Sequence, residues 1–447
     1  MKLLSQIAAE LQGYDPTALP AGKVNEFLVQ LVQPVFSTET LPLAQALDRV
    51  LAADVISPIS VPAHDNSAMD GFAFCGADLK SGAPTRLSVV GTALAGKAYA
   101  GGVTNGQCVK IMTGAIMPAG LDTVIPAELC KIEDLQIEIA ADVLKIGDNR
   151  RLAGEDLMAG SVALSKGEQL SPAALGLLAS LNMAQVQVFR KIKIAYFSTG
   201  DEVLSLGDAP REGAIYDSNR YTVIGLLKRW GAEVIDMGVA RDEPALLEAA
   251  FIQAANQADA VITSGGVSVG EADFTKAMMK KLGDVAFWKI AMRPGRPMAV
   301  GRILKAKMAG SRHEISSVSY QNNSDSCLLF GLPGNPVAAM VTMLAFVRPA
   351  LARLQGLNPQ KYCAEPLYLK AASQETLRKK PGRTEYQRGI VSRAVDGSLS
   401  VRTTSSNQGS GVLSSMVAAN GLIVLHHDQG NVKVGDAVDV MMFEGVM

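Results

Sequence analysis

The chain contains little cysteine, histidine or aromatic side chain for its 447 residues, with 5 cysteines, 4 histidines and 5% aromatic residues. No cysteines form a Cys-x-x-Cys pair, and no histidines have the His-x-x-x-His spacing of a helical metal site. A structural zinc site and a secreted disulfide framework are therefore not expected.

An excess of charge of one sign is also missing, because 42 basic side chains balance 43 acidic ones. No overall field attracts nucleic acid or an acidic membrane, so we expect a small, locally recognised ligand. Glu10 follows the N-terminus too soon for a signal peptide, and no apolar run approaches the ~18 residues that span a bilayer. These absences predict a cytoplasmic protein.

The length suggests several folding units, since one domain holds about 150 residues. Apolar side chains at helical spacing predict a helix over Val24–Val35, and a second short helix is expected over Leu41–Leu51. Residues 58–157 alternate short β-like runs with Gly, Pro and Asn turns, which predicts a strand-rich domain. Residues 357–447 return to the same rhythm and predict a small β-domain.

Residues 191–356 predict an α/β domain with a doubly wound parallel sheet. Strands and helices alternate along this stretch, in the order Lys193–Phe197, Tyr221–Trp230, Glu233–Met237, Pro244–Gln257 and Ala258–Thr263. Ligands of such sheets bind at the carboxyl ends of the strands. Polar segments follow several of these ends, namely Ser198–Glu202, Arg241–Glu243, Ser264–Asp273 and Gly331–Pro336.

The segment Ser264–Asp273 is the most informative part of the sequence, because a buried strand runs into a glycine turn and a helix start. Glycines let backbone amides close on an anion, and a helix N-terminus adds free N–H groups. Glu271 and Asp273 would repel a phosphate unless a divalent cation bridges them. The alternative is a simple strand-to-helix turn in which the acids stabilise the helix dipole.

A fourth loop, Gly331–Pro336, also follows a predicted strand and so lies at the same edge of the sheet, with Asn335 as a helix N-cap and Pro336 as the first helical residue.

In the strand-rich domain, polar groups gather on glycine turns at Asp65–Ala73, Met112–Pro118, Asp122–Glu128 and Arg150–Asp156. Such turns suit a cleft for a polyanion, although turns also favour Asp and Gly for structural reasons.

Taken together, these motifs resemble the molybdopterin molybdenumtransferase family (MoeA-like, related to the C-terminal domain of gephyrin) over essentially the whole chain. The matching segments are Ser67–Ala73, Met112–Gly114, Gly154–Asp156, Ser198–Glu202, Tyr216–Asn219, Thr263–Asp273 and Gly331–Pro336. The resemblance implies an elongated, usually dimeric protein, in which residues 1–57 and 158–190 form a linear linking domain. It also implies a C-terminal β-barrel and a cleft built from both chains.

The implied reaction inserts molybdate into the dithiolene of adenylylated molybdopterin and releases AMP, with Mg²⁺ near the phosphates. The resemblance implies catalytic roles for Asp70, Thr113, Asp156, Glu202 and Asp242. It implies metal ligation by Asp242, Glu202, Glu271 and Asp273. The resemblance also implies substrate binding by Ser264, Gly265, Gly266, Ser268, Gly270, Asp273, Lys289, Arg293, Arg296, Pro333, Gly334, Asn335 and Pro336. Contact with the molybdopterin adenylyltransferase and with cofactor-receiving enzymes is implied as well.

Molybdate is a dianion, and fixed positive charge from Lys289, Arg293 and Arg296 suits it, with Ser406 and Ser410 as neighbouring hydroxyl donors. The alternative for the basic residues is a solvated turn. Family members usually carry lysine where Arg293 and Arg296 stand. The Ser- and Asn-rich stretch Lys305–Asp325 is a second departure and predicts a mobile surface loop.

Two other functions fit parts of the pattern. The α/β domain also resembles the molybdopterin adenylyltransferase, which catalyses the preceding step, but the additional domains and the motifs Met69–Gly71 and Gly331–Pro336 argue against it. A non-catalytic dimeric scaffold that displays a peptide groove is the other alternative, and retention of every acidic motif disfavours it. The sequence does not discriminate molybdate from tungstate, because the two oxyanions share charge and shape.

Overall fold

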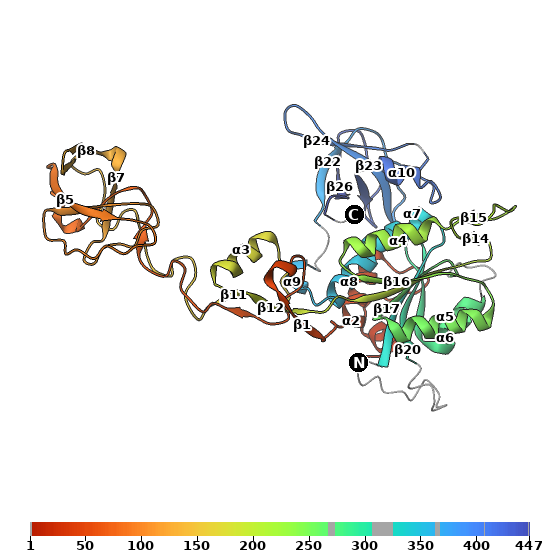
Figure 1. Ribbon diagram of the computed structural model, residues 1–447. Helices are drawn as coiled ribbons and strands as arrows, with labels where there is room; N and C mark the ends of the chain where they lie inside the picture. Colours follow the sequence, from red (N-terminus) through yellow and green to blue (C-terminus); the bar gives the residue numbers. More distant parts are fainter. Residues whose placement is uncertain (1, 267–272, 306–324, 363–366, 406, 446) are drawn as a thin grey trace.

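The computed structural model describes residues 2–266, 273–305, 325–362, 367–405, 407–445 and 447. Figure 1 shows an elongated chain with a strand-rich lobe at one end and a larger body at the other. We call these parts the distal lobe, residues 58–157, and the main body, residues 4–35 and 191–447. The predicted Lys305–Asp325 loop lies outside the described residues, except for its two ends.

The distal lobe is built around a six-stranded sheet in the order β7-β4-β6-β5-β9-β8. Successive side chains of β4 pack into different apolar clusters, Ala73 into one and Phe72 with Phe74 into another, so both faces of the sheet are covered. The strands are β4 (Gly71–Phe74), β5 (Thr85–Ala93), β6 (Gln107–Ile111), β7 (Thr123–Pro126), β8 (Cys130–Glu133) and β9 (Gln136–Ile139). A further pair joins β3 (Asn66–Ser67) to β10 (Arg150–Arg151).

Two chain segments connect the distal lobe to the main body, and they pair with each other along their length (Figure 1). β1 (Thr38–Pro42) pairs with β12 (Gln185–Phe189), and β2 (Val55–Ile56) pairs with β11 (Val162–Leu164). Helix α3 (Pro172–Ser180) packs on this linker, with Ser171 accepting a hydrogen bond from Ala174 N as its N-cap. The predicted helix over Leu41–Leu51 is wrong, because Leu41 pairs with Val186 in β1 and only the 3₁₀ turn Leu43–Gln45 follows.

The main body contains the predicted α/β sheet, with six strands in the order β16-β13-β17-β21-β20-β18. β16, β13, β17 and β21 are mutually parallel, whereas β20 is antiparallel to both β21 and β18. The strands are β13 (Lys193–Thr199), β16 (Glu233–Ala240), β17 (Ala260–Ser264), β18 (Gly283–Lys289), β20 (Pro297–Leu304) and β21 (Ser326–Leu332). The predicted parallel α/β architecture is confirmed.

Helices cover both faces of this sheet. α4 (Ser218–Arg229), α2 (Ala21–Leu31) and the α7 to α8 helix pack in one apolar cluster with Ile194 and Tyr196, whereas α5 (Pro244–Gln257) and α6 (Asp273–Leu282) pack with Ala195 and Phe197. α2 confirms the helix predicted over Val24–Val35, but it ends at Leu31, and Val32 is already extended. A shorter helix, α1 (Leu4–Glu10), packs beside α2. Both faces of β13 are therefore buried, as the continuous apolar strand requires.

One described helix, Pro336–Leu354, has the length and hydropathy of a membrane span, but 78% of its apolar window is buried within the protein. It consists of α7 (Pro336–Thr342), a π-helical turn (Met343–Val347) and α8 (Arg348–Leu354). Its burial beside the sheet makes it a core helix of the main body.

The C-terminal part forms a closed five-stranded barrel, as expected from the resemblance. The ring runs β23-β24-β22-β26-β25 and closes through a pairing of β25 with β23. Its strands are β22 (Leu369–Ser373), β23 (Thr384–Arg393), β24 (Leu399–Thr403), β25 (Gly421–Leu425) and β26 (Ala437–Met442), with helix α10 at Ser414–Ala418. β19 (Met292–Arg293), from the α/β part, pairs with β23 and so attaches the barrel beside the sheet. A short helix, α9 (Pro359–Tyr362), precedes it.

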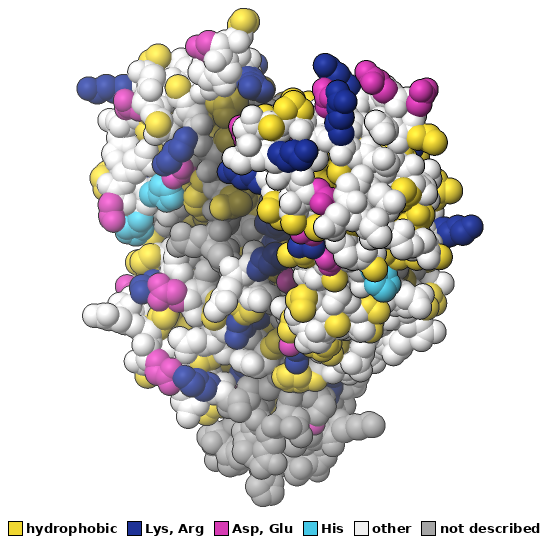
Figure 2. All heavy atoms as spheres, turned by 90° about the vertical axis from the view of Figure 1, so that its left-hand side faces the viewer, with side chains coloured by type: hydrophobic (Ala, Val, Ile, Leu, Met, Phe, Trp, Pro, Cys, Tyr) yellow, Lys and Arg dark blue, Asp and Glu magenta, His cyan; other side chains and the backbone are white. Residues whose placement is uncertain are grey.

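Acidic and basic side chains are interspersed over the face of the molecule that Figure 2 draws. Figure 2, in which the distal lobe faces the viewer, shows both signs scattered among apolar and neutral side chains. This surface agrees with the balanced charge of the sequence.

Candidate functional site

The carboxyl ends of the parallel strands meet at one edge of the α/β sheet, and this edge is the candidate site. The loops that follow β13, β16, β17 and β21 carry four of the predicted segments, namely Gly200–Glu202, Arg241–Asp242, Gly265–Gly266 and Pro333–Asn335. β18 is antiparallel to β20 and β20 to β21, so Lys289 at the end of β18 lies at the same edge. The predicted convergence of separate loops is confirmed.

Glycine is required in the loop after β17. Gly265 has φ +90°, and a Cβ there would lie 2.5 Å from the carbonyl oxygen of Thr199. Gly266 has φ +64°, and its Cβ would lie 2.8 Å from the side chain of Thr275. Both the left-handed backbone and the close approach exclude larger residues. Gly265 N donates to Leu332 O at 3.3 Å, which joins this loop to the end of β21.

Several predicted residues of this loop cannot be placed. Ser268, Gly270 and Glu271 lie outside the described residues, and Asp273 is described only as the first residue of α6. Their predicted roles in binding phosphate and metal therefore stay predictions.

A cluster of three hydroxyl groups lies beneath the loops. The Tyr196 hydroxyl is 2.7 Å from Ser264 Oγ and 2.9 Å from Ser198 Oγ, and the two serine oxygens are 3.2 Å apart. All three side chains are buried, and burial raises the pKa of the Tyr196 hydroxyl. The cluster cross-links the ends of β13 and β17. The sequence analysis missed Tyr196, because it lies within an apolar strand.

Acidic side chains gather beside the ends of β13 and β16. Asp242 N donates to Asp201 Oδ1 at 3.3 Å. Desolvation raises the pKa of the Asp242 carboxyl, and the negative charges of Asp201 and Glu202 raise it further. Within the described part of the chain no three acidic or imidazole groups form a ready-made metal cage. Mg²⁺ binds proteins through one or two carboxylates plus substrate phosphates, and Asp242 and Glu202 are the described carboxylates at this edge that could hold it.

The predicted basic residues lie at the other side of the same edge. Lys289, Arg293 and Arg296 are all exposed, on the turn that connects β18 to β20 through β19. Arg293 pairs with Glu385 of the barrel in the β19–β23 register. Ser410 also approaches from the barrel, since Val337 N donates to its carbonyl oxygen at 3.0 Å. Ser406 lies outside the described residues.

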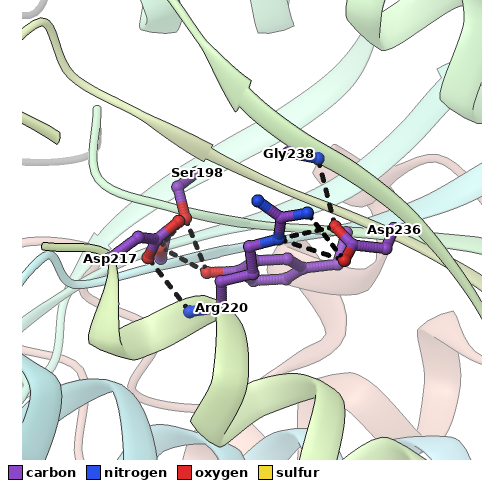
Figure 3. Close-up of polar contacts among 7 residues, drawn as sticks. Ser198, Asp217, Arg220, Asp236 and Gly238 are labelled. Atoms are coloured by element: carbon purple, nitrogen blue, oxygen red, sulfur yellow. Dashed lines mark hydrogen bonds and ion pairs between the residues drawn. The ribbon is translucent and has the colours of Figure 1, made fainter. Parts of the chain in front are cut away.

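The first turn of α4 completes the edge. Asp217 is the N-cap and accepts a hydrogen bond from Arg220 N at 3.1 Å through Oδ1. The Arg220 guanidinium forms an ion pair with Asp236 of β16 at 2.8 Å (Figure 3). Asn219 Nδ2 donates to the carbonyl oxygen of Gly334 at 2.7 Å. Thus α4 is attached both to the sheet and to the loop after β21.

The loop after β21 differs in one detail from the expectation. Asn335 occupies the N-cap position before Pro336, but its side chain makes no capping hydrogen bond. Gly334 and Asn335 are exposed, whereas Pro333 is buried. The loop therefore presents its backbone and the Asn335 side chain at the edge.

The remaining predicted residues lie in the distal lobe. Asp70 Oδ1 accepts hydrogen bonds from Thr113 N at 2.6 Å and Thr113 Oγ1 at 2.8 Å, and these bonds lower the pKa of the Asp70 carboxyl. Asp156 lies beside a cavity of about 390 Å³ that Asn66, Arg151 and Glu155 also line. Figure 1 places this lobe at the far end of the linker from the α/β sheet. A single chain therefore does not bring these residues to the sheet edge.

A larger cavity, of about 1160 Å³, lies at the opposite edge of the sheet, among residues that include Arg190, Asp259 and Arg302. Asp259 precedes β17, and Arg190 binds it through two bonds of 2.7 Å. This cavity contains none of the predicted site residues.

Comparison with known proteins assigns each part of the chain to a family region. Residues 21–182 match the MoeA N-terminal region (domain I and II), residues 195–353 match the probable molybdopterin binding domain, and residues 370–443 match the MoeA C-terminal region (domain IV). A crystal structure of the molybdopterin biosynthesis moeA protein from Pyrococcus horikoshii OT3 is similar with a TM-score of 0.76 and 26% identity. The match covers 95% of this chain and 100% of that one.

Curated relatives extend the match over nearly the full length. The molybdopterin molybdenumtransferase of Haemophilus influenzae is 42% identical over 423 residues, which are 95% of this chain and 98% of the relative. The enzyme of the same name from Bacillus subtilis is 33% identical and covers 91% of this chain and 90% of its own. The chain therefore belongs to the molybdopterin molybdenumtransferase family, a family of transferases.

Proposed function

We propose that this protein inserts molybdenum from molybdate into adenylylated molybdopterin and releases AMP. The observation that carries the proposal is the convergence at one sheet edge of a glycine loop, an acidic group and a basic turn. A substrate with a pyrophosphate and an incoming oxyanion needs all three kinds of group. Membership of the family supports the same reaction.

The glycine loop and the loop after β21 would hold the phosphates. Gly265 and Gly334 approach closely, since a Cβ on Gly334 would lie 3.9 Å from Gly265 Cα. Two backbone segments without side chains in this position leave room for phosphate oxygens beside peptide N–H groups. Ser264 supports the first loop from beneath through its bond to Tyr196.

Asp242 and Glu202 are the described residues that would hold Mg²⁺, with Glu271 and Asp273 as further candidates. Desolvation raises the pKa of Asp242, and the negative charges of Asp201 and Glu202 raise it further, so a bound cation would offset unfavourable negative charge here. When bound, the ion would screen the carboxylates from the phosphates and stabilise charge on the phosphate oxygens. Asp201 would keep the Asp242 backbone in place through its bond to Asp242 N.

Lys289, Arg293 and Arg296 would bind molybdate. Their exposure at the sheet edge leaves their charges available to an oxyanion that enters between the α/β sheet and the barrel. Arginine presents a planar fork of donors, whereas lysine presents a point charge. The two arginines would therefore fix the orientation of the oxyanion more strictly than lysines would.

A homodimer would complete the site. Asp70, Thr113 and Asp156 lie in the distal lobe, away from the sheet edge of their own chain (Figure 1). The lobe of a second copy would bring them to this edge. The depressed pKa of Asp70 keeps its carboxylate charged, which suits a role in orienting polar groups of the substrate.

The test is AMP release by purified protein given adenylylated molybdopterin, Mg²⁺ and either molybdate or tungstate, with the Asp242→Ala variant as control. We expect molybdate-dependent release that falls by about 100-fold or more in the variant, as for the loss of a group that stabilises charge in the reaction. Release with tungstate alone would preserve the mechanism and change the product. No release with either oxyanion and a verified substrate would refute the proposal and favour the scaffold function.

A further inference from the structure

Asn219 links helix α4 to the loop that follows β21, although nothing in the reaction assigns it a role. Its side chain is 8% exposed, and its Nδ2 donates to the Gly334 carbonyl oxygen at 2.7 Å. The two residues are 115 positions apart in the sequence. A buried side-chain donor that reaches a backbone carbonyl over this separation fixes the position of the loop.

The contact determines which way the following N–H group points. The Gly334–Asn335 peptide is trans, since the cis bonds of the described chain are Val61–Pro62 and Arg293–Pro294. In a planar trans peptide the C=O and N–H groups point in opposite directions. Because Asn219 holds the Gly334 carbonyl toward α4, the Asn335 N–H points away from α4.

The Asn335 N–H is available to a ligand. Asn335 is exposed, and no described residue accepts a hydrogen bond from its backbone nitrogen. In the adjoining loop, Gly265 N donates to Leu332 O at the end of β21, which keeps the two loops side by side. An oxyanion seated against these loops would meet an N–H donor whose direction is set in advance.

The start of α4 is itself held in place, so Asn219 has little freedom. Asp217 caps the helix through Arg220 N, and Arg220 forms an ion pair with Asp236 of β16 (Figure 3). Asp217 and Asn219 are both more than nine-tenths buried. The sheet thus positions α4, and the Asn219 side chain of α4 holds the loop.

We infer that Asn219 is a positioning residue, which orients the Gly334–Asn335 peptide so that its N–H binds a phosphate oxygen of the substrate. This inference rests on the proposed function for the identity of the substrate. It predicts that Asn219 affects affinity for the phosphate group more than the rate of the bound complex.

The test uses Asn219→Ala and the isosteric Asn219→Asp, in which a carboxylate faces the Gly334 carbonyl. Asn25→Ala is the matched control, because Asn25 Nδ2 also donates to a backbone carbonyl, that of Ala345 at 3.3 Å. The Oδ1 atoms of Asn25 and Asn219 are both buried and have no hydrogen-bond partner among the described residues. Two quantities are measured: KM and kcat for AMP release, and the Kd of pyrophosphate by calorimetry. Urea unfolding of each variant identifies any loss of fold.

We expect both Asn219 variants to raise KM and the pyrophosphate Kd by about 10-fold, which is the effect of one well-formed hydrogen bond, while kcat falls by less than about 3-fold. The Asn25 control should change neither. Unchanged KM and Kd in a folded Asn219→Asp variant would overturn the inference and leave the proposed function intact. Absence of AMP release by the unmodified protein would refute the function, and the pyrophosphate Kd values would still decide the role of Asn219.

Discussion

The sheet edge and the distal lobe contain the two halves of the site we propose, and they hold their polar groups in different ways. At the edge, buried side chains support the loops over long sequence separations, as Tyr196 does for Ser264 and Asn219 does for Gly334. In the distal lobe, Asp70 is exposed and is held mainly by one partner, Thr113. The edge is therefore preorganised by the fold of the main body, whereas Asp70 is oriented locally at a surface.

The contrast between the buried supports of the sheet edge and the exposed Asp70 bears on how a surface carboxylate could take part in the proposed site. We expect the two hydrogen bonds of Asp70 to contribute little to stability, because they are exposed to solvent. In the proposed dimer, the distal lobe would carry Asp70 to the sheet edge of the other chain. We therefore expect variants of the distal lobe to change activity without changing stability, and variants that support the sheet edge to change the free energy of unfolding.

The largest effect is expected from Asp70→Asn, which should lower kcat/KM for AMP release by about 100-fold while leaving the unfolding midpoint unchanged. Asp15→Asn is the matched control, since Asp15 Oδ1 accepts the same pair of bonds from Thr17 N and Thr17 Oγ1, at 2.8 and 2.7 Å. Steady-state kinetics and urea unfolding measure both quantities. Equal activity of the Asp70 and Asp15 variants would remove the distal lobe from the site.

Gly265→Ala should destabilise the main body by about 1–3 kcal/mol, because alanine disfavours φ +90° and its Cβ would meet the Thr199 carbonyl. Pyrophosphate binding should weaken as the loop moves. Gly176→Ala, in helix α3 with no atom near the added Cβ, should instead stabilise the protein by about 0.5–1 kcal/mol. Urea unfolding compares the two; a Gly265 variant as stable as the Gly176 variant would contradict the geometry.

Tyr196→Phe should cost about 1 kcal/mol of unfolding free energy, because two buried serine hydroxyls lose a partner but retain each other at 3.2 Å. Tyr99→Phe, whose hydroxyl bonds the Val90 carbonyl at an exposed position, should cost less. Thermal unfolding measures the difference. If both substitutions lower the unfolding temperature by the same amount, the hydroxyl cluster does not stabilise the edge.

The smallest effect concerns pH. Thr113→Val removes one of the hydrogen bonds that lower the pKa of Asp70, so this pKa should rise toward its ordinary value. In the proposed reaction Asp70 acts as the carboxylate, so the acidic limb of kcat/KM should move to higher pH, with activity retained well above both pKa values. Thr17→Val raises the pKa of Asp15 by the same mechanism and should not move the limb. A limb that stays in place in both variants would show that Asp70 does not control it.

The sequence was sufficient to predict the sheet edge, because each polar loop directly follows a strand and parallel strands end together. It was insufficient for Tyr196, since only the β13–β17 register, which pairs Ser198 with Ser264, brings the three hydroxyls into contact. The role of Asn219 also depends on a packing contact between α4 and a distant loop. Leu41 was assigned to a helix, but pairing with Val186 outweighed its local spacing.

The central claim is that one site contains the sheet edge of one chain and the distal lobe of another. The most direct test is to co-express Asp70→Asn and Asp242→Ala chains with different tags, purify the mixed dimer through both tags, and measure AMP release. The account predicts about half of the unmodified activity, because one of the two sites then contains both intact halves. A mixed dimer as inactive as each parent variant would contradict the claim.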